Sequence, residues 1–283
     1  MTPRQRRLAR RLRQLRVNAG VGIDDAAAHI GCKHPKITKI ELCRLGAKPE
    51  EVRQLCELYG ASRATVASMV DLARTARARG WYQSYDDAAN PENIEFVDLE
   101  TDAVAVSAFQ VDLVPGLLQT PGYSRAVIRA GHPDIGEDVL AQRVELRGRR
   151  QDRVLDGALS VWAVVAEAAL VRAMGGRDAH VAQLRHLIGL AALPNVQFQV
   201  VPNRAGEHMA MGVPFSCFRF DDGSGTVAID HLSGTFFLEE EKDVDRYRLA
   251  FHHLCGVALS QHDSLALLRR YTEEEHSEWE LRS

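Results

Sequence analysis

The sequence has few cysteines, and they form no pattern that would serve a metal site or a disulfide framework. The five cysteines are scattered, odd in number and without a CxxC pair. This argues against a structural zinc site and a secreted disulfide-rich fold, and it favours the reducing cytoplasm. No apolar run reaches the roughly 18 residues that a membrane span needs, so we expect no membrane partner. The basic start of the chain is not followed by an apolar stretch, so it is not typical of a secretory signal.

The sequence also lacks the short motifs that mark common enzyme families. It contains no HExxH, no GxSxG, no Walker loop and no GxGxxG. His208, Asp230, His231 and Glu167 could take part in catalysis, but no spacing ties them into one site. Cys217 alternates with phenylalanines, which favours a core position over a nucleophile. We therefore expect a protein that is not an enzyme and has no cofactor or metal, and an enzyme gated by DNA is the less favoured hypothesis.

Charge is present in quantity but is unevenly distributed. The chain has 283 residues, 46% of them apolar, which suggests about two domains with sizeable cores. Residues 1–80 hold 17 Lys and Arg against 7 Asp and Glu, a net charge of +10. The other 203 residues hold 18 against 31, a net charge of −13. This asymmetry indicates a nucleic-acid module joined to an acidic body, although an arginine-rich helix can also be a solvated face.

The basic segment is expected to fold as five helices. Leu8, Leu12 and Leu15 recur at helical spacing among arginines, which indicates an amphipathic first helix. The expected elements are a first helix ended by Asn18-Ala19-Gly20, a second capped by Asp24 or Asp25, a third over Pro35–Leu42 ended by Leu45-Gly46, a fourth over Glu50–Tyr59, and a fifth over Ser62–Arg77 capped by Ser62.

The second and third of these helices have the layout of a helix-turn-helix, joined by a tight turn at Gly31-Cys32. The second helix of such a pair enters the major groove of double-stranded DNA. Ile37 and Ile40 are expected to face inward, so the opposite arc would meet base edges, while Arg44 and Lys48 would meet phosphates. The candidate DNA-binding residues are Lys33, His34, Pro35, Lys36, Thr38, Lys39, Arg44 and Lys48. A generic five-helix interaction domain is the alternative.

One carboxylate interrupts the basic character of the third helix. Glu41 lies at its end, among lysines and arginines. We interpret it as a structural partner for an arginine of the first helix, such as Arg10 or Arg13, and not as a reader of bases.

The stretches Ala26–Gly31 and Lys36–Glu41 resemble the Cro/CI-type (XRE) helix-turn-helix. That family usually has Gln at the start of the second helix, where this chain has Asp24 or Asp25. Ser or Gln is common near the start of its third helix, where this chain has His34-Pro35. Because a carboxylate would repel phosphate, the phosphate contact that the family makes at the start of its second helix is not expected here. With these differences, the family's DNA target sequences cannot be transferred to this chain.

The acidic remainder is expected to be an α+β domain behind a linker at residues 81–96, which are rich in Asp, Asn and Pro. Its most distinctive segment is Leu113–Tyr123, with a turn at Pro115-Gly116 and a helix capped by Thr120. The expected elements are helices over Gly122–Arg129, Ile135–Leu155, Glu167–Met174, Ala179–Leu193, Asp243–Ala258 and His262–Tyr271, strands at Leu159–Val165, Val196–Val201, Phe215–Phe220, Thr226–His231 and Thr235–Glu239, hairpin turns at Asp221–Gly225 and Ser233-Gly234, and a frayed tail at 272–283.

A second, more specific resemblance concerns this acidic domain. It is carried by Leu99-Glu100, Leu113–Tyr123, Pro194–Pro202, Ala205-Gly206 and Pro214-Phe215. Together with the helix-turn-helix, these segments resemble the actinobacterial WhiJ-like regulators over about residues 6–271. The resemblance implies a sensing or interaction role for the acidic domain, and a small protein encoded by a neighbouring gene as antagonist or co-regulator.

These features predict a multidomain protein with an all-α five-helix domain at 1–80 and an α+β regulatory and dimerisation domain at 81–283. We expect a cytoplasmic homodimer that regulates transcription, because two heads match two DNA half-sites about one helical turn apart. The alternative is an antitoxin-like interaction module that sequesters a small neighbouring-gene product and regulates its own synthesis. Trp81-Tyr82 and Phe236-Phe237 are candidate partner contacts, and core packing is the more favoured role for both.

Overall fold

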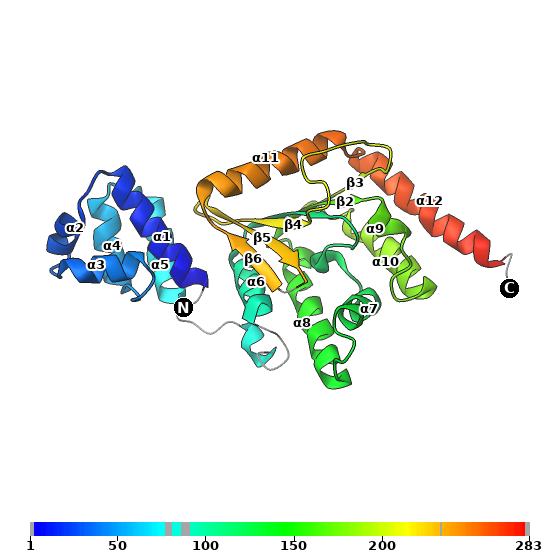
Figure 1. The fold of residues 1–283 in the computed structure, drawn as a ribbon, viewed down its shortest axis with the longest axis horizontal. Helices are drawn as coiled ribbons and strands as arrows, with labels where there is room; N and C mark the ends of the chain where they lie inside the picture. The colour runs from blue at the N-terminus through cyan, green and yellow to red at the C-terminus, as the bar shows by residue number, and fades with distance from the viewer. Residues whose placement is uncertain (1–2, 77–80, 86–90, 233, 281–283) are drawn as a thin grey trace. The chain divides into compact units, whose positions relative to one another are not determined.

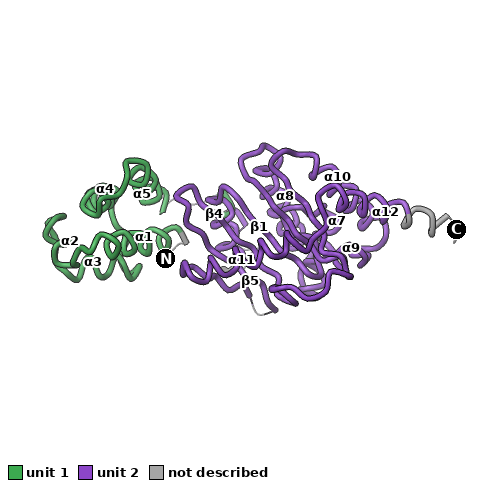
Figure 2. Tube along the Cα trace, turned by 90° about the horizontal axis from the view of Figure 1, so that it is seen from above, with its two compact units in different colours: residues 1–83 green, residues 84–283 purple. Residues whose placement is uncertain are grey.

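The computed structural model describes residues 3–76, 81–85, 91–232 and 234–280. The chain divides into two compact units, Met1–Gln83 and Ser84–Ser283, which Figure 2 shows in separate colours. The sequence predicted a boundary three residues earlier, after residue 80. Arg77, at the predicted end of the fifth helix, and Ser233, in a predicted turn, lie outside the described residues.

The N-terminal unit contains the five predicted helices. They are α1 (Pro3–Asn18), α2 (Ile23–His29), α3 (His34–Glu41), α4 (Pro49–Leu58) and α5 (Arg63–Thr75). One apolar cluster holds them together because each helix contributes a face at helical spacing. Its buried members include Leu8, Leu12, Ile37, Ile40, Val52, Leu55, Met69 and Leu72.

Two helix ends in this unit differ from the prediction. Helix α2 is capped by the backbone of Gly22, so Asp24 and Asp25 lie in its first turn, where carboxylates interact favourably with the helix dipole. Helix α3 ends at Glu41, one residue before the predicted end at Leu42, and the residue that breaks it is Cys43 instead of Leu45-Gly46. It ends early because Cys43 has a φ of 53°, a left-handed conformation that breaks the helical path. The predicted Ser62 cap of α5 is confirmed, since its side chain accepts from the Thr65 N–H.

The C-terminal unit is α+β, as predicted. Its elements, together with the short helix η1 at the boundary, are η1 (Trp81–Tyr85), α6 (Pro91–Asp102), β1 (Ala105–Gln110), η2 (Gly116–Leu118), α7 (Pro121–Gly131), α8 (Glu137–Leu155), β2 (Ser160–Ala166), α9 (Ala168–Val171), α10 (Arg177–Leu190), β3 (Val196–Val201), β4 (Phe215–Arg219), β5 (Gly225–His231), β6 (Gly234–Leu238), α11 (Glu241–Val257) and α12 (Gln261–Glu280).

Six strands form one mixed sheet in the order β3-β2-β1-β4-β5-β6. Strands β1, β2 and β3 are parallel, and β4, β5 and β6 follow as antiparallel neighbours. Figure 1 shows α11 on one face of the sheet and α6, α7, α8 and α10 on the other. Side chains alternate between the two faces, so Val106 and Ala108 join one core cluster while Phe109 joins the other.

Three segments of this unit differ from the sequence-based expectation. The predicted linker, 81–96, contains η1 and the start of α6, because Pro91 suits the first turn of a helix. Strand β1 was not predicted, although it lies in the middle of the sheet. Helix α12 extends to Glu280, beyond the predicted end at Tyr271, because its glutamate-rich continuation has high helix propensity.

Candidate nucleic-acid interface

The turn between α2 and α3 has the backbone that a helix-turn-helix requires. Gly31 has a φ of 66°, which a glycine adopts at little cost. The Cys32 N–H then donates to the Ala27 carbonyl at 2.8 Å and closes the end of α2. On α3, Ile37 and Ile40 are only 1% and 2% exposed, so the predicted inward face of this helix is confirmed. The opposite face of α3 is therefore directed outward.

The outward face of α3 carries most of the candidate DNA-binding side chains. Lys33, His34, Pro35 and Lys39 are exposed, and Thr38 is half-buried. The Thr38 hydroxyl lies 3.4 Å from the His34 carbonyl, one turn back along the helix. This surface is thus cationic and open, and Lys39 is one of its exposed side chains.

Lys36 lies differently from the other candidates. Its ammonium donates to the Glu51 carboxylate at 2.5 Å, in a partly buried ion pair with α4. The same carboxylate accepts from the Lys48 N–H at 3.0 Å. Burial by itself would raise the pKa of Glu51, but these two hydrogen bonds outweigh it, and the pKa lies below its ordinary value. Lys36 therefore joins α3 to α4.

His34 lies beside a carboxylate at the start of α3. Its Nδ1 is 2.7 Å from Asp24 Oδ1 on α2, and both side chains are largely exposed. Asp24 is one of the two acids at the start of the second helix that, by sequence, argued against a phosphate contact there. In the structure its partner is His34. Arg44 and Lys48, which follow α3 in the chain, are both exposed.

Glu41 has the structural role that the sequence suggested, but with a different partner. Its two carboxylate oxygens accept from Arg16 Nε at 2.7 Å and Arg16 Nη2 at 2.9 Å, not from Arg10 or Arg13. Arg16 also donates to the Val21 carbonyl at 3.0 Å, so it links α1, the following turn and α3. This hydrogen bonding raises the pKa of Arg16 above its ordinary value.

The arginine-rich helix α1 is more than a solvated face. Of its seven arginines, Arg13 is exposed, Arg7 is buried at 6% exposure, and the others are half-buried. Arginine stems can cover apolar surface while the charged heads remain near water. The helix therefore contributes to the core of the unit as well as to its charge.

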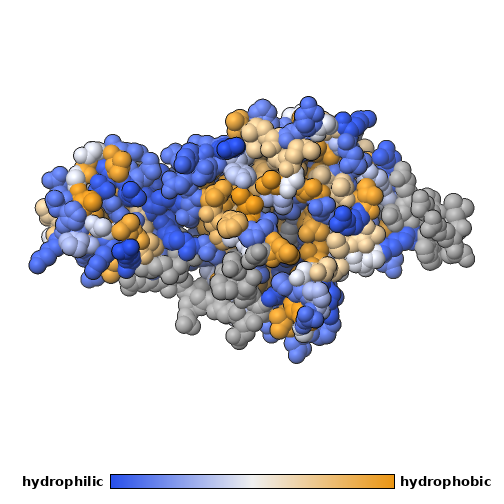
Figure 3. All heavy atoms as spheres, in the orientation of Figure 1, coloured by the Kyte–Doolittle hydropathy of each residue, from blue (hydrophilic) through white to orange (hydrophobic). Residues whose placement is uncertain are grey.

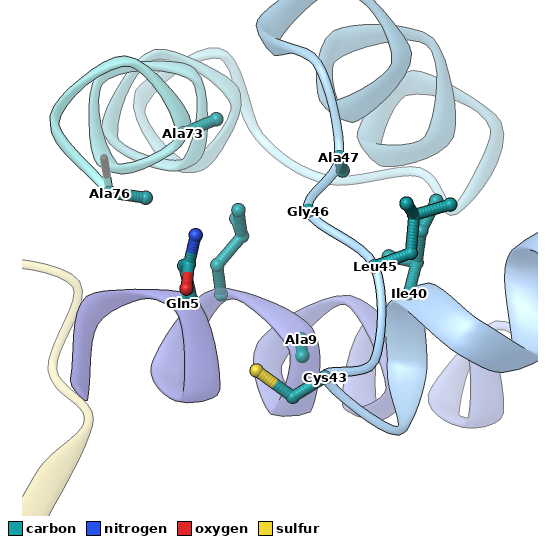
Figure 4. Close-up of a pocket in the computed structure, with 10 residues that line it drawn as sticks. Gln5, Ala9, Ile40, Cys43, Leu45, Gly46, Ala47, Ala73 and Ala76 are labelled. Carbon is teal, nitrogen blue, oxygen red and sulfur yellow. The ribbon is translucent and has the colours of Figure 1, made fainter. Parts of the chain in front are cut away.

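A hollow between α1, the turn after α3 and α5 is too small for a ligand. Figure 4 shows Gln5, Ala9, Cys43 and Ala76 around it. Its cavity volume is about 10 Å³, which is room for about one water molecule. This hollow therefore has no part in binding, and the candidate DNA-binding side chains lie on the surface.

In the C-terminal unit, Glu167, His208 and Asp230, which were considered for catalysis, each make their own local contacts. Glu167 accepts hydrogen bonds from the Tyr271 hydroxyl and from the Asn203 N–H, and His208 packs edge-on against Phe109. Asp230 accepts from the Thr235 hydroxyl at 2.6 Å. Among the described residues, no group of three His, Cys, Asp or Glu side chains could hold a metal ion.

The cysteine predicted to be core is indeed core. Cys217 is 7% exposed on β4, and burial raises the pKa of its thiol to about 12. A thiol with such a pKa carries almost no nucleophilic thiolate at neutral pH.

The aromatic pairs considered as partner contacts have mixed exposure. Tyr82 is buried against the half-buried Trp81, and Phe237 packs against the sheet core. Phe236 is 60% exposed and stacks on His231. Figure 3 shows hydrophobic residues gathered over the sheet region of the C-terminal unit, whereas on the visible face of the N-terminal unit they are scattered among hydrophilic ones.

The distinctive segment Leu113–Tyr123 is held in place by buried glutamines. The Gln119 amide donates to the Val114 carbonyl at 2.6 Å. The Gln183 amide donates to the Leu118 carbonyl at 2.6 Å, and its oxygen accepts from the Thr120 N–H at 2.7 Å. The predicted Thr120 cap of α7 is confirmed. These contacts fix a loop that follows the carboxyl end of β1 and connects it to α7.

Comparisons with known proteins agree with this two-part organisation. Residues 7–69 match the family described as a helix-turn-helix domain, a kind of domain typical of DNA-binding regulators. Residues 94–270 match the family described as a domain of unknown function, DUF5753. Searches of curated proteins and of solved structures gave no match. None of the described helices has the length and hydropathy needed to span a membrane. The chain belongs to the DUF5753 family and joins that domain to an N-terminal helix-turn-helix domain.

Proposed function

We propose that the protein is a sequence-specific transcriptional regulator of the Cro/CI type that reads double-stranded DNA through α3. The observation that carries this proposal is the outward cationic face of α3, opposite the buried Ile37 and Ile40. In this proposal Lys39, which is exposed on α3, meets base edges in the major groove, and Lys33 is exposed before the helix begins. Arg44 and Lys48 are assigned to phosphates.

In the same proposal, Lys36 has a smaller part in reading bases than the sequence suggested. Its ammonium is occupied by Glu51, and freeing it would cost that ion pair. His34 is oriented by Asp24, which holds the ring beside the start of α3. These two contacts support a preorganised helix end.

The C-terminal domain is proposed to dimerise the protein and to receive a regulatory signal. An α+β domain of this size exceeds what DNA contact by the head requires, and dimeric heads match paired half-sites. We also propose that the protein acts in the cytoplasm and, as the WhiJ-like resemblance implies, together with a small protein. Sedimentation equilibrium of the full chain should give twice 31.4 kDa. A mass of 31.4 kDa at the concentrations that bind DNA would contradict dimerisation.

The test of DNA reading begins with enrichment of bound duplexes from a random library by the full-length protein. Affinity for the enriched duplex is then measured against salt. The logarithm of affinity should fall steeply with the logarithm of salt concentration, by about 0.9 for each phosphate contacted. Failure to enrich any sequence, or a flat salt dependence, would contradict the proposal. If the enriched sequence occurs only in the protein's own promoter, and the protein binds a small partner protein tightly, the antitoxin-like alternative is favoured.

Two lysine variants separate base reading from general charge. Lys39→Ala should weaken specific binding by about 1–3 kcal/mol and relax preference at one position of the site. Lys242→Ala is the matched control, because Lys242 is an exposed lysine on α11, outside the helix-turn-helix domain. A loss that is uniform over all duplexes for Lys39→Ala would move Lys39 to the phosphate class.

A further inference from the structure

The C-terminal unit contains a half-open cavity between its sheet and the helices on the α8 side. The cavity measures about 160 Å³, and a second hollow of about 200 Å³ adjoins it and shares Phe96, Val127, Arg147 and Arg150 among its lining residues. The rim of the outer hollow includes the exposed His132. A cavity of about 150 Å³ is large enough for a benzene ring.

The distinctive segment of the sequence forms one wall of this cavity. Six of its residues line it, from Leu113 to Leu117 together with Gln119. The opposite wall is the sheet face that carries Val106 and Ala108 of β1 and Val161 of β2. Gly116 brings bare backbone close to two guanidinium groups, since an added Cβ would lie 3.7 Å from Arg147 Nε. The Leu113–Leu117 segment and the sheet face thus supply an apolar surface, and two guanidinium groups lie beside Gly116. Polar side chains, among them Asn93, Gln110 and Ser216, complete the lining.

Arg147 is the under-compensated charge in this cavity. Its Nη1 donates to the neutral Gln119 side chain at 2.6 Å. Within the described part of the chain, Gln119 is its one hydrogen-bond partner, and Arg147 makes no ion pair with a carboxylate. Burial, with a contribution from nearby Arg150, lowers the pKa of Arg147 to about 10, although the carboxylates of Glu100 and Asp230 act in the opposite direction. A guanidinium in such a place stabilises an anion that enters beside it.

The other charged groups at the cavity are already engaged. Arg150 donates to both oxygens of Glu100, at 2.7 and 2.8 Å, and this pair is almost fully buried. Asp230 is exposed at the end of β5 and accepts from Thr235. Arg143 lines the outer hollow and adds positive charge there. The cavity and hollow together therefore have room for one negative charge next to Arg147.

We propose that this cavity binds a small apolar monocarboxylic acid, with the carboxylate on Arg147 and the apolar body against the sheet face and the Leu113–Leu117 wall. The size of the cavity favours a single ring or a short chain over a nucleotide, and the apolar part of its lining suits the body of such a molecule. Use of this ligand as the regulatory signal rests on the proposed function, but binding itself does not.

The experiment is calorimetric titration of the full-length protein, without DNA, with 3-phenylpropionate as the probe. The neutral control is 3-phenylpropanamide, which has nearly the same shape and no charge. We expect one saturable site for the acid and binding of the amide that is weaker by about 10- to 100-fold, as expected for loss of a charge-assisted hydrogen bond. Because DNA is absent, failure here leaves the DNA-binding proposal unaffected.

Three variants and one control test the residues assigned to the site. Arg147→Met should lower the affinity for the acid by about 10- to 100-fold, and Ala108→Leu should abolish binding by filling the space. Arg149→Met is the matched control on the same helix, because Arg149 is exposed and lies outside the cavity lining. Arg147→Lys keeps a cation and should keep the preference for acid over amide, even if Arg147→Met unfolds.

Three results would overturn the proposal. The first is equal affinity for acid and amide. The second is unchanged affinity in a folded Arg147→Met protein, shown by its thermal transition. The third is absence of saturable binding by both 3-phenylpropionate and hexanoate at millimolar concentrations.

Discussion

At the scale of single residues, two carboxylates of the N-terminal unit have roles that only their surroundings explain. Glu41 and Arg16 form a bidentate pair whose side chains are 6% and 12% exposed. Glu51 joins Lys36 to the start of α4. In a segment of net charge +10, these acids act inside the fold and leave the outer face of α3 positive.

Replacing Glu41 should destabilise the N-terminal unit strongly. Glu41→Gln removes the charge opposite Arg16 and leaves a nearly buried guanidinium, at an expected cost of about 2–4 kcal/mol. Urea unfolding followed by circular dichroism measures this cost. Glu50→Gln is the control, because Glu50 pairs with Arg53 in the open and its loss should hardly matter. Equal effects of the two substitutions would contradict the structural role of Glu41.

The Glu51 contacts should appear as a dependence of stability on pH. The folded pKa of Glu51 lies below the ordinary value of 4.5, so folding favours the charged form. Its stabilisation is therefore fully present above about pH 4.5 and is lost as the pH falls through the folded pKa. The difference in thermal midpoint between the unaltered protein and Glu51→Gln should be largest near neutral pH and shrink in acid. A difference that is constant with pH would argue against the ion pair.

At the scale of elements, glycine conformation separates the turn of the helix-turn-helix from a helix interior. Gly31 has a φ of 66° and no atom within 4 Å of where a Cβ would lie. Gly148 lies within α8 with the same open space and without a positive φ. Identical substitutions at the two sites therefore isolate the backbone contribution.

We expect opposite signs for these two substitutions. Gly31→Ala should destabilise its unit by about 1 kcal/mol, because an L side chain is strained in the left-handed region. Gly148→Ala should stabilise α8 by about 0.5–1 kcal/mol through helix propensity. Chemical denaturation of each variant measures both. Stabilisation by Gly31→Ala would mean that the turn between α2 and α3 has another conformation.

At the scale of the whole molecule, the two units have separate cores and opposite charge. The buried cluster of residues 1–83 is distinct from the two clusters on either face of the sheet. Each unit thus has the apolar core that independent folding requires.

This separation predicts the behaviour of a chain cut after residue 83. The fragment 1–83 should keep its helical circular dichroism and its salt-dependent attraction to DNA, because α3 and its cationic face remain. Its affinity for the enriched duplex should fall well below that of the full chain, since two heads are no longer linked and effective concentration is lost. Affinity equal to that of the full chain would argue against dimerisation through the C-terminal domain.

Local patterns in the sequence were sufficient for most helices and for five of the six strands. Leu8 and Leu12, Ile37 and Ile40, and the Thr120 cap with Pro121 each depend on spacing along a short stretch, which sequence displays directly. The Asp/Asn/Pro-rich stretch before α6 and the short β1 were missed, because local composition there favours loop while packing at the centre of the sheet favours order.

The candidate sites divide along the same line. The exposed face of α3 could be predicted, because helical periodicity alone separates Lys39 from Ile37. Three contacts could not be predicted: the pairing of Arg16 with Glu41, the pairing of Lys36 with Glu51, and the position of Arg147 beside a cavity with Gln119 as its partner. The residues in these contacts lie 15 to 28 positions apart in the chain. Which partner a charged side chain finds, and how deeply it is buried, depends on which helices pack together. The sequence therefore determined which helices form and where the positive charges lie along the chain. The tertiary structure decided which of these charges pair with a carboxylate, and that Arg147 lies beside a cavity, because both depend on how the helices pack.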